Sequence, residues 1–183
     1  MISDKEREEK IKLINDKVTK YPDFPKKGVL FYDLFSILND PTLRTNTLLL
    51  AFSDISKALK GKFNTIAGIE SRGLMLGLYL AQEFNVNFVA IRKPSKLPGK
   101  VVKAEFTKEY GKDSMELQEN AVNKGSTVLV IDDLLATGGT LKAAEEVINK
   151  CGGTVIAHYV IFNIKFLEGE KKLSHPVVYS MEI

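Results

Sequence analysis

The sequence predicts an α/β fold in which a mainly parallel central sheet is flanked by helices. Short apolar segments alternate with longer segments of helical spacing along most of the 183 residues. Such alternation is typical of a parallel sheet covered on both faces. The segment Val128–Ile131 has four consecutive apolar residues, as expected for a strand that is buried on both faces.

The first predicted helix covers residues 6–20, where Ile11, Ile14 and Val18 recur at helical spacing. Pro22 and Pro25 follow this helix, and each disfavours helix at the residue before it. A second helix is predicted at 41–60, with Pro41 in its first turn and Gly61 just beyond its end. The later elements are a strand at 65–69, a helix at 73–84, a strand at 86–91, a possible hairpin arm at 101–107, a strand at 128–131, a helix at 141–148, and strands at 154–162 and 177–181.

Length and composition indicate one globular domain. A chain of 183 residues with 44% hydrophobic content can bury a substantial core. The net charge of +3 is too small to indicate nucleic-acid binding by itself, but it suits an anionic substrate.

Cysteine content and the first residues indicate the compartment. Cys151 is the single cysteine, which excludes an intrachain disulfide framework and agrees with a reducing compartment. Residues 1–10 are highly charged and lack the apolar region of a signal peptide. No apolar run approaches the length of a membrane span. We therefore expect a cytoplasmic protein.

The two histidines, His158 and His175, are expected to be structural. No other Cys or His lies near either of them in the sequence, which gives little support to a zinc site or a Cys–His dyad.

The strongest functional motif follows the strand Val128–Ile131. Asp132 and Asp133 stand at its carboxyl end, where open α/β sheets place their ligands. The next turn and the start of a helix provide backbone N–H groups for a phosphate. This predicted phosphate loop consists of Ala136, Thr137, Gly138, Gly139 and Thr140. The two carboxylates would accept from a ribose diol, and a side chain at Gly138 is expected to fill the phosphate space.

A second strand-to-helix turn, residues 68–73, offers another anion site. Ser71 and Arg72 lie in this turn, together with the free backbone amides of the following helix. Two anion sites with an acidic pair between them fit a ribose that carries a 5′-phosphate and a 1-pyrophosphate.

The segment at about 94–113 is predicted to be a flexible lid. Seven Lys or Arg and three Asp or Glu occur from Arg92 to Asp113, and few residues of the segment could fix it to a core. Long basic excursions between core strands are usually functional. The alternative is an ordinary solvated hairpin.

Several motifs occur together in one order. They are Phe24-Pro25-x-x-Gly28-Val29-Leu30-Phe31-x-Asp33, residues 68–73, Ile91-Arg92-Lys93 with Lys96-Leu97-Pro98-Gly99, Glu109-Tyr110-Gly111, and residues 132–140. From about residue 21 to residue 175, this arrangement resembles the adenine phosphoribosyltransferases, a family of type I phosphoribosyltransferases.

The resemblance implies a single domain over residues 1–183, with a helix and base-binding hood at 1–35 and an α/β core at 36–183. It implies Mg²⁺-dependent transfer of the 5-phosphoribosyl group from phosphoribosyl pyrophosphate (PRPP) to adenine, which gives AMP and pyrophosphate in purine salvage. It also implies a homodimer, with no nucleic-acid or membrane partner.

The resemblance also implies roles for individual residues. Phe31 and Leu134 would stack on the two faces of adenine, with Arg72 nearby. The carbonyl of Leu30 would accept from the 6-amino group, and a 6-oxo purine would leave an unsatisfied pair that costs about 1–3 kcal/mol. The pyrophosphate residues would be Ser71, Arg72, Arg92, Lys93 and Lys96, some of them acting across a dimer interface.

Two further roles concern catalysis. Glu109 would act as acid or base on the lid, beside Tyr110. No residue would be a direct metal ligand, since Mg²⁺ would be held mainly by PRPP and contact Asp132 or Asp133 through water.

The chain departs from the family pattern at three places. Tyr32 stands where Arg is common, Asn163 stands where an acidic residue is common, and Gly169-Glu170 stands where the family has Gly-Arg.

Three other functions are compatible with parts of this pattern. The first is a related transferase that acts on hypoxanthine, guanine or xanthine. The second is a PRPP-sensing regulator that binds nucleic acid, although a basic face or an added domain is not evident. The third is PRPP synthesis, which would need an ATP site, and no such motif occurs.

Overall fold

The computed structural model describes residues 2–24, 27–28, 30–108 and 111–183. Its central sheet has the strand order β10-β9-β7-β3-β4, and all of these neighbours are parallel. The strands are β3 (Thr65–Ile69), β4 (Asn87–Ile91), β7 (Thr127–Ile131), β9 (Thr154–Asn163) and β10 (Val177–Glu182), and the short β8 (Leu134–Leu135) pairs with the end of β9. The parallel α/β prediction is confirmed.

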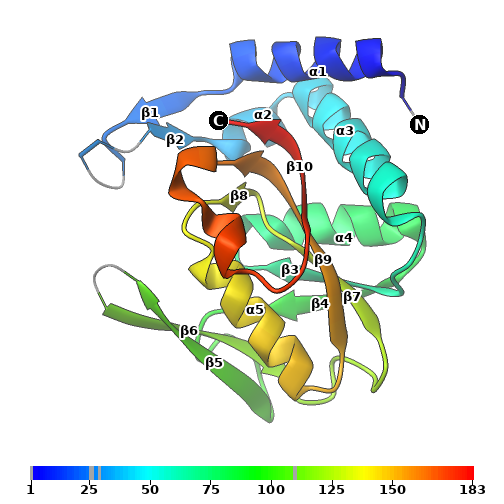
Figure 1. Ribbon diagram of the computed structural model, residues 1–183, viewed down its shortest axis with the longest axis vertical. Helices are drawn as coiled ribbons and strands as arrows, with labels where there is room; N and C mark the ends of the chain where they lie inside the picture. The colour runs from blue at the N-terminus through cyan, green and yellow to red at the C-terminus, as the bar shows by residue number, and fades with distance from the viewer. Residues whose placement is uncertain (1, 25–26, 29, 109–110) are drawn as a thin grey trace.

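Helices cover both faces of this sheet (Figure 1). They are α1 (Asp4–Lys17), α2 (Leu34–Asn39), α3 (Pro41–Leu59), α4 (Arg72–Phe84) and α5 (Gly139–Lys150). Leu129 and Ile131 of β7 pack in one apolar cluster with α3 and α4, while Val128 and Val130 pack in a second cluster with α5. All four are fully buried, as predicted for a strand with two covered faces.

The predicted limits of α3 are confirmed. Asp40 caps the helix by accepting from the backbone N–H of Thr42 at 2.7 Å, and Pro41 occupies its first turn. Lys60 and Gly61 then adopt left-handed conformations with φ of 49° and 72°. The first helix, by contrast, ends at Lys17, a few residues earlier than expected.

A small two-stranded unit follows α1. β1 (Lys20–Pro22) pairs antiparallel with β2 (Leu30–Tyr32), and α2 comes directly after β2. The sequence patterns did not predict these short elements. The ring of Tyr32 lies 5.2 Å from that of Phe162 at the end of β9, so this unit packs onto the core. We call the unit formed by β1 and β2 the hood.

The basic segment forms an antiparallel hairpin of β5 (Val101–Lys108) and β6 (Gly111–Gln118). Figure 1 shows it at the opposite end of the long axis from α1. Within the predicted lid segment at about 94–113, Ala104 is the fully buried hydrophobic residue among those described, and the second arm adds two more. Ala104, Met115 and Leu117 are at most 2% exposed and pack in the same cluster as α5. Both arms therefore contribute side chains to a core, and residues 109–110 lie outside the described residues.

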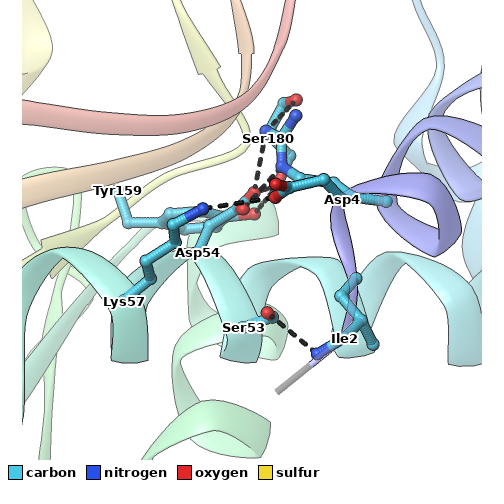
Figure 2. A network of polar contacts seen from close by, with 8 residues as sticks. Ile2, Asp4, Ser53, Asp54, Lys57, Tyr159 and Ser180 are labelled. Atoms are coloured by element: carbon cyan, nitrogen blue, oxygen red, sulfur yellow. Dashed lines mark hydrogen bonds and ion pairs between the residues drawn. The ribbon is translucent and has the colours of Figure 1, made fainter.

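A buried polar network joins α1 to the core (Figure 2). The Nε atom of Arg7 lies 2.8 Å from Oδ1 of Asp54 on α3, and Ser180 Oγ donates to Asp54 Oδ2 at 2.8 Å. The hydroxyl of Tyr159 lies 2.7 Å from Ser180 Oγ. α1, α3, β9 and β10 thus meet at one carboxylate.

Other expectations are tested within the described part of the chain. His158 is fully buried, and its Nε2 atom lies 2.9 Å from Oε1 of Glu145, which fits the predicted structural role. In the ranges that the structure describes, no helix is long and apolar enough to cross a membrane.

Candidate active site

A cavity of about 420 Å³ lies at the carboxyl ends of β3 and β7. The described residues that line it are Phe35, Glu70, Ser71, Arg72, Lys93, Met115, Asp132, Asp133, Leu134, Leu135, Ala136, Thr137, Gly138, Gly139, Thr140 and Leu141. This is the edge of a parallel sheet at which ligands bind in open α/β folds. The acidic pair, the predicted phosphate loop and the 68–73 turn therefore meet in one cavity.

The acidic pair follows β7 directly. Both carboxylates line the cavity, but their surroundings differ. Asp133 is only 3% exposed, and its Oδ2 atom lies 2.9 Å from Nε of Arg72. Asp132 is half-buried and accepts from the backbone N–H of Asp133 at 2.9 Å. Asp133 is thus engaged with Arg72, whereas Asp132 keeps a partly accessible carboxylate in the cavity.

Burial raises the pKa of both carboxyl groups. For Asp132, burial acts together with the charge of Asp133, and the pKa lies well above its ordinary value. For Asp133, burial also raises the pKa, and the nearby Arg72 guanidinium opposes that change. The pair therefore favours a ligand that offers hydroxyl donors or positive charge, either of which stabilises the ionised carboxylates.

The predicted phosphate loop has the expected backbone geometry. Gly138 adopts a left-handed conformation with φ of 79°, and α5 begins at Gly139. The N–H groups of the first turn of α5 have no partner within the helix, which makes this turn suited to an anion. Thr137 and Thr140 line the cavity beside it.

One detail of this loop differs from the expectation. A Cβ atom added to Gly138 would collide with the carbonyl oxygen of Gly169 and would not point into the phosphate space. Glycine is required here by its positive φ and by the backbone behind the loop.

Two glycines bring the start of α4 against the ends of the strands. A Cβ atom at Gly68 would lie 2.6 Å from the carbonyl oxygen of Gly73, and one at Gly73 would collide with the carbonyl oxygen of Ile131. Because neither side chain is present, the 68–73 turn can approach Asp132 closely. Ser71 and Arg72 consequently line the same cavity as the acidic pair.

Arg72 connects the cavity with the hood. Its guanidinium is paired with Asp133 and lies 5.1 Å from the centre of the Phe31 ring. That distance is typical of a cation–π contact. Phe31 also packs edge-on against Phe24, with ring centres 5.0 Å apart.

Glu70 holds the segment after β4. Its carboxylate accepts from Nε and Nη2 of Arg92, both at 3.2 Å, and from the backbone N–H of Lys93 at 2.9 Å. Burial would raise the pKa of Glu70, but these hydrogen bonds and cations lower it overall. Arg92 is therefore engaged within the chain, while Lys93 borders the cavity.

The structure thus brings together most of the predicted site. Residues predicted for the site that line the cavity are Ser71, Arg72, Lys93, Asp132, Asp133, Leu134, Ala136, Thr137, Gly138, Gly139 and Thr140. Leu30, Phe31, Arg92 and Lys96 are described but are not among its lining residues. Glu109 and Tyr110 lie outside the described residues.

Sequence reasoning gave no role to Phe35, Glu70, Met115, Leu135 and Leu141, which also line the cavity. Glu70 lies inside the quoted 68–73 motif, so its position offered a signal. The sequence around Phe35 and Met115 gave no such signal, because α2 and β6 reach the cavity only through tertiary packing.

Two of the departures from the family pattern contact each other. Asn163, at the end of β9, is 1% exposed and donates through Nδ2 to Oε1 of Glu170. The third departure, Tyr32, packs on Phe162 and lies beneath Nζ of Lys20, 5.0 Å from its ring centre. None of these three residues is among the described lining residues of the cavity.

Comparison with known proteins agrees with this fold. A family model described as a phosphoribosyl transferase domain matches residues 49–181, well over half of the chain. The class of protein is therefore a phosphoribosyltransferase.

Relatives narrow the class further. Adenine phosphoribosyltransferase of Nitrosopumilus maritimus is 44% identical over 88% of this chain and 93% of that protein. The Drosophila pseudoobscura pseudoobscura enzyme of the same name is 42% identical over 91% of each chain. A solved structure of adenine phosphoribosyltransferase from Saccharomyces cerevisiae, complexed with an imino-altritol bisphosphate and adenine, has a TM-score of 0.90 and 35% identity over 95% of this chain and 99% of that one. The chain belongs to the adenine phosphoribosyltransferase family.

Proposed function

We propose that the protein transfers the 5-phosphoribosyl group of PRPP to adenine, forming AMP and pyrophosphate in purine salvage. The observation that carries this proposal is the cavity, where a helix N-terminus with its threonines, a half-buried carboxylate and a second strand-to-helix turn face one space. The family relationship supports the same reaction, since the yeast relative was crystallised with adenine and a sugar bisphosphate analogue.

The ligand groups are assigned by charge. The 5′-phosphate is assigned to Ala136–Thr140, where the first amides of α5 and two threonines border the cavity. The ribose diol donates to Asp132, with Asp133 contributing through its pairing with Arg72. The pyrophosphate lies toward Ser71, Arg72 and Lys93.

Adenine is assigned to the side of the cavity that faces the hood, between Phe31 and Leu134 and near Arg72. The backbone N–H of Asp33 donates to Thr19 across the ladder at 2.9 Å, which makes Tyr21 and Phe31 the next hydrogen-bonded pair. Pro22 and Leu30 are then a non-hydrogen-bonded pair. The N–H and carbonyl of Leu30 therefore point away from β1, and we propose that they recognise the edge of adenine.

Breaking the C1–O bond builds positive charge on the ribose and negative charge on the leaving pyrophosphate. Arg72 and Lys93 stabilise the leaving group, and Asp132 favours the cationic ribose. Arg92 and Lys96 are proposed as further pyrophosphate contacts across a dimer interface. Glu109 is proposed to move the adenine N9 proton, with Tyr110 beside it in sequence on the proposed lid, where exclusion of water would protect the cation.

We propose that Mg²⁺ accompanies PRPP. Among the described residues, no cluster of three or more Cys, His, Asp or Glu is placed to hold a metal ion. The oxygen donors that border the cavity, Asp132 foremost, suit a hard cation that keeps its waters. When bound, the ion would neutralise phosphate charge.

The domain organisation remains a proposal: one domain over 1–183, with an N-terminal helix and base-binding hood at 1–35, an α/β core at 36–183 and a lid at about 94–113. A homodimer is proposed because apolar side chains gather on α2 and α4: Phe35, Met75, Leu78 and Tyr79 are 41–58% exposed. Leu78→Glu should shift the mass measured by light scattering toward a monomer.

A cytoplasmic location is proposed from the single cysteine.

The reaction is tested by measuring AMP formation from PRPP with adenine, hypoxanthine, guanine and xanthine in turn. We expect adenine to be preferred over hypoxanthine by about 1–3 kcal/mol in kcat/KM, the cost of an unsatisfied hydrogen-bond pair. Preference for a 6-oxo purine would overturn the assignment of Leu30. Absence of transfer to every base, with PRPP still bound, would favour a sensor of PRPP.

A further inference from the structure

The backbone of the phosphate loop contacts a segment after β9 that does not line the cavity. Two short 3₁₀ helices, η1 (Lys165–Leu167) and η2 (Gly169–Lys172), follow β9. A Cβ atom at Gly138 would collide with the carbonyl oxygen of Gly169. One at Gly169 would collide with the carbonyl oxygen of Ala136 and would lie 3.0 Å from the backbone nitrogen of Gly138. The two backbones are in contact with no room for a methyl group, so the position of Gly169 fixes that of the loop.

The same segment is tied to the strand that precedes the loop. Leu135 and Asn163 are parallel partners in β8 and β9, and the backbone N–H of Ile164 donates to the carbonyl of Leu135 at 2.9 Å. The side chain of Asn163 then donates to Glu170, the residue after Gly169. Asn163 is therefore the register partner of Leu135, just before the loop, and its side-chain amide bonds to Glu170, next to the glycine that contacts the loop.

The negative charge of Glu170 has a cation beside it. Lys165 Nζ lies 3.3 Å from Oε1 of Glu170. The amide of Asn163 is buried, so it depends on Glu170 for its partner. Neither Asn163 nor Glu170 is among the described lining residues of the cavity. Their effect on a ligand must act through the loop.

We propose that Asn163 and Glu170 are positioning residues for the phosphate loop. Their hydrogen bond holds Gly169 against Gly138, and this contact sets the direction of the loop amides toward the 5′-phosphate. The inference rests on the proposed assignment of the loop to that phosphate.

The test exchanges donor and acceptor in the full-length chain. Asn163→Asp alone places a second carboxylate against Glu170, and we expect the Kd for PRPP and for ribose 5-phosphate, measured by calorimetry, to rise about tenfold or more, which corresponds to about 1.4 kcal/mol. Glu170→Gln alone keeps an acceptor for Asn163 and should be mild. The double variant Asn163→Asp with Glu170→Gln restores a hydrogen bond in the opposite direction and should recover at least most of the affinity.

A second pair of variants keeps the test informative if Asn163→Asp does not fold. Glu170→Met removes the acceptor at a half-buried position and should weaken ribose 5-phosphate binding. Glu168→Met removes a neighbouring carboxylate that pairs with Lys171 at 2.6 Å, and it should leave the Kd unchanged. In both sets of variants, the KM for adenine should stay within about twofold of wild type. A twofold change corresponds to less than about 0.5 kcal/mol of binding free energy.

The outcomes separate this inference from the proposed function. Folded Asn163→Asp and Glu170→Met variants with wild-type Kd for ribose 5-phosphate would overturn the positioning role. Failure of the exchange to restore a weakened Kd would also overturn it. Equal rises in the KM for PRPP and adenine would indicate a general structural defect instead. A wild-type protein that binds ribose 5-phosphate but forms no AMP would contradict the proposed reaction and leave the positioning role testable by calorimetry.

Discussion

The Nε atom of Arg72 lies 2.9 Å from Oδ2 of Asp133, and this ion pair joins the two strand ends that form the cavity. Arg72 begins the helix after β3, and Asp133 follows β7. Since Arg72 also lies over the ring of Phe31, the pair links the acidic motif to the hood. The two neighbouring carboxylates therefore have separable roles.

Asp132→Asn should weaken PRPP binding and leave adenine binding nearly unchanged. Losing a hydrogen bond to a charged group costs about 1.5–3 kcal/mol, or roughly tenfold to a hundredfold in Kd. Asp133→Asn removes the ion pair with Arg72, so it should weaken the binding of both PRPP and adenine. Because burial raises the pKa of both carboxyls, neither change should unfold the protein. Calorimetry with each ligand and thermal denaturation would check this, and identical profiles for the two variants would contradict separate roles.

Gly138→Ala should abolish measurable PRPP binding and lower the free energy of unfolding by more than the cost of positive φ alone. That cost is about 1–2 kcal/mol for a residue with a side chain. Gly125→Ala is the matched control, because Gly125 has φ of 83° and open space where its Cβ would lie. Denaturant unfolding and calorimetry measure both effects. Equal losses of stability in the two variants would show that Gly169 imposes no steric limit.

Glu109→Gln should lower kcat while the Kd for PRPP stays close to that of wild type. General acid–base catalysis typically contributes on the order of 10²–10⁴-fold. Glu109→Leu should be at least as damaging, because it would also remove the hydrogen bond to the purine that the proposed role requires. Single-turnover rates are needed, since slow product release can hide a slower chemical step. Single-turnover rates within about threefold of wild type for both variants would remove Glu109 from the mechanism. Such a change in rate corresponds to a change of less than about 1 kcal/mol in the activation barrier.

Glu145 should make stability depend on acidic pH. Burial alone would raise its pKa, but hydrogen bonds from His158, Lys142 and the backbone of Ser174 lower it to about 2 from 4.5. A lowered folded-state pKa contributes stability that is present above the unfolded value and is lost as pH falls toward the folded value. The contribution is on the order of 3 kcal/mol.

The measurement compares Glu145→Gln with wild type in denaturant unfolding from pH 7 to pH 2. The difference in unfolding free energy should be constant above about pH 5.5 and should shrink between about pH 4.5 and 2. Glu146→Gln is the control, because Glu146 is 47% exposed and pairs with Lys150 at the surface. A pH-independent difference for Glu145→Gln would contradict the lowered pKa.

The parallel sheet and most of the residues that line the cavity were predictable because local sequence specifies them. Val128–Ile131 is apolar throughout, and the residues after it carry carboxylates, glycine and threonine in a fixed order. A parallel sheet then brings β3 and β7 to a common edge. Ser71 and Asp132 both line the cavity there, although they are 61 positions apart in the sequence.

The missed features depend on contacts between distant segments. The hood strands are three residues each, too short for a clear pattern, and Tyr32 is held by Phe162. Arg92 has the sequence context of a phosphate ligand, but its orientation depends on Glu70 across two strand ends. The buried arms of the basic hairpin follow from packing against α5, which charge counting does not reveal.

The shared carboxylate of Asp54 has a consequence for how the chain opens. Arg7 donates to this 9%-exposed group and to the carbonyl of Ser180, which lies 173 positions away in sequence. If α1 detached, a mostly buried negative charge would lose its cation, so local fraying of this helix is penalised. Backbone amides in α1 should therefore exchange with deuterium at rates close to those in β10, as members of one cooperative unit. The helix that leads into the hood would then open only when the sheet edge opens with it.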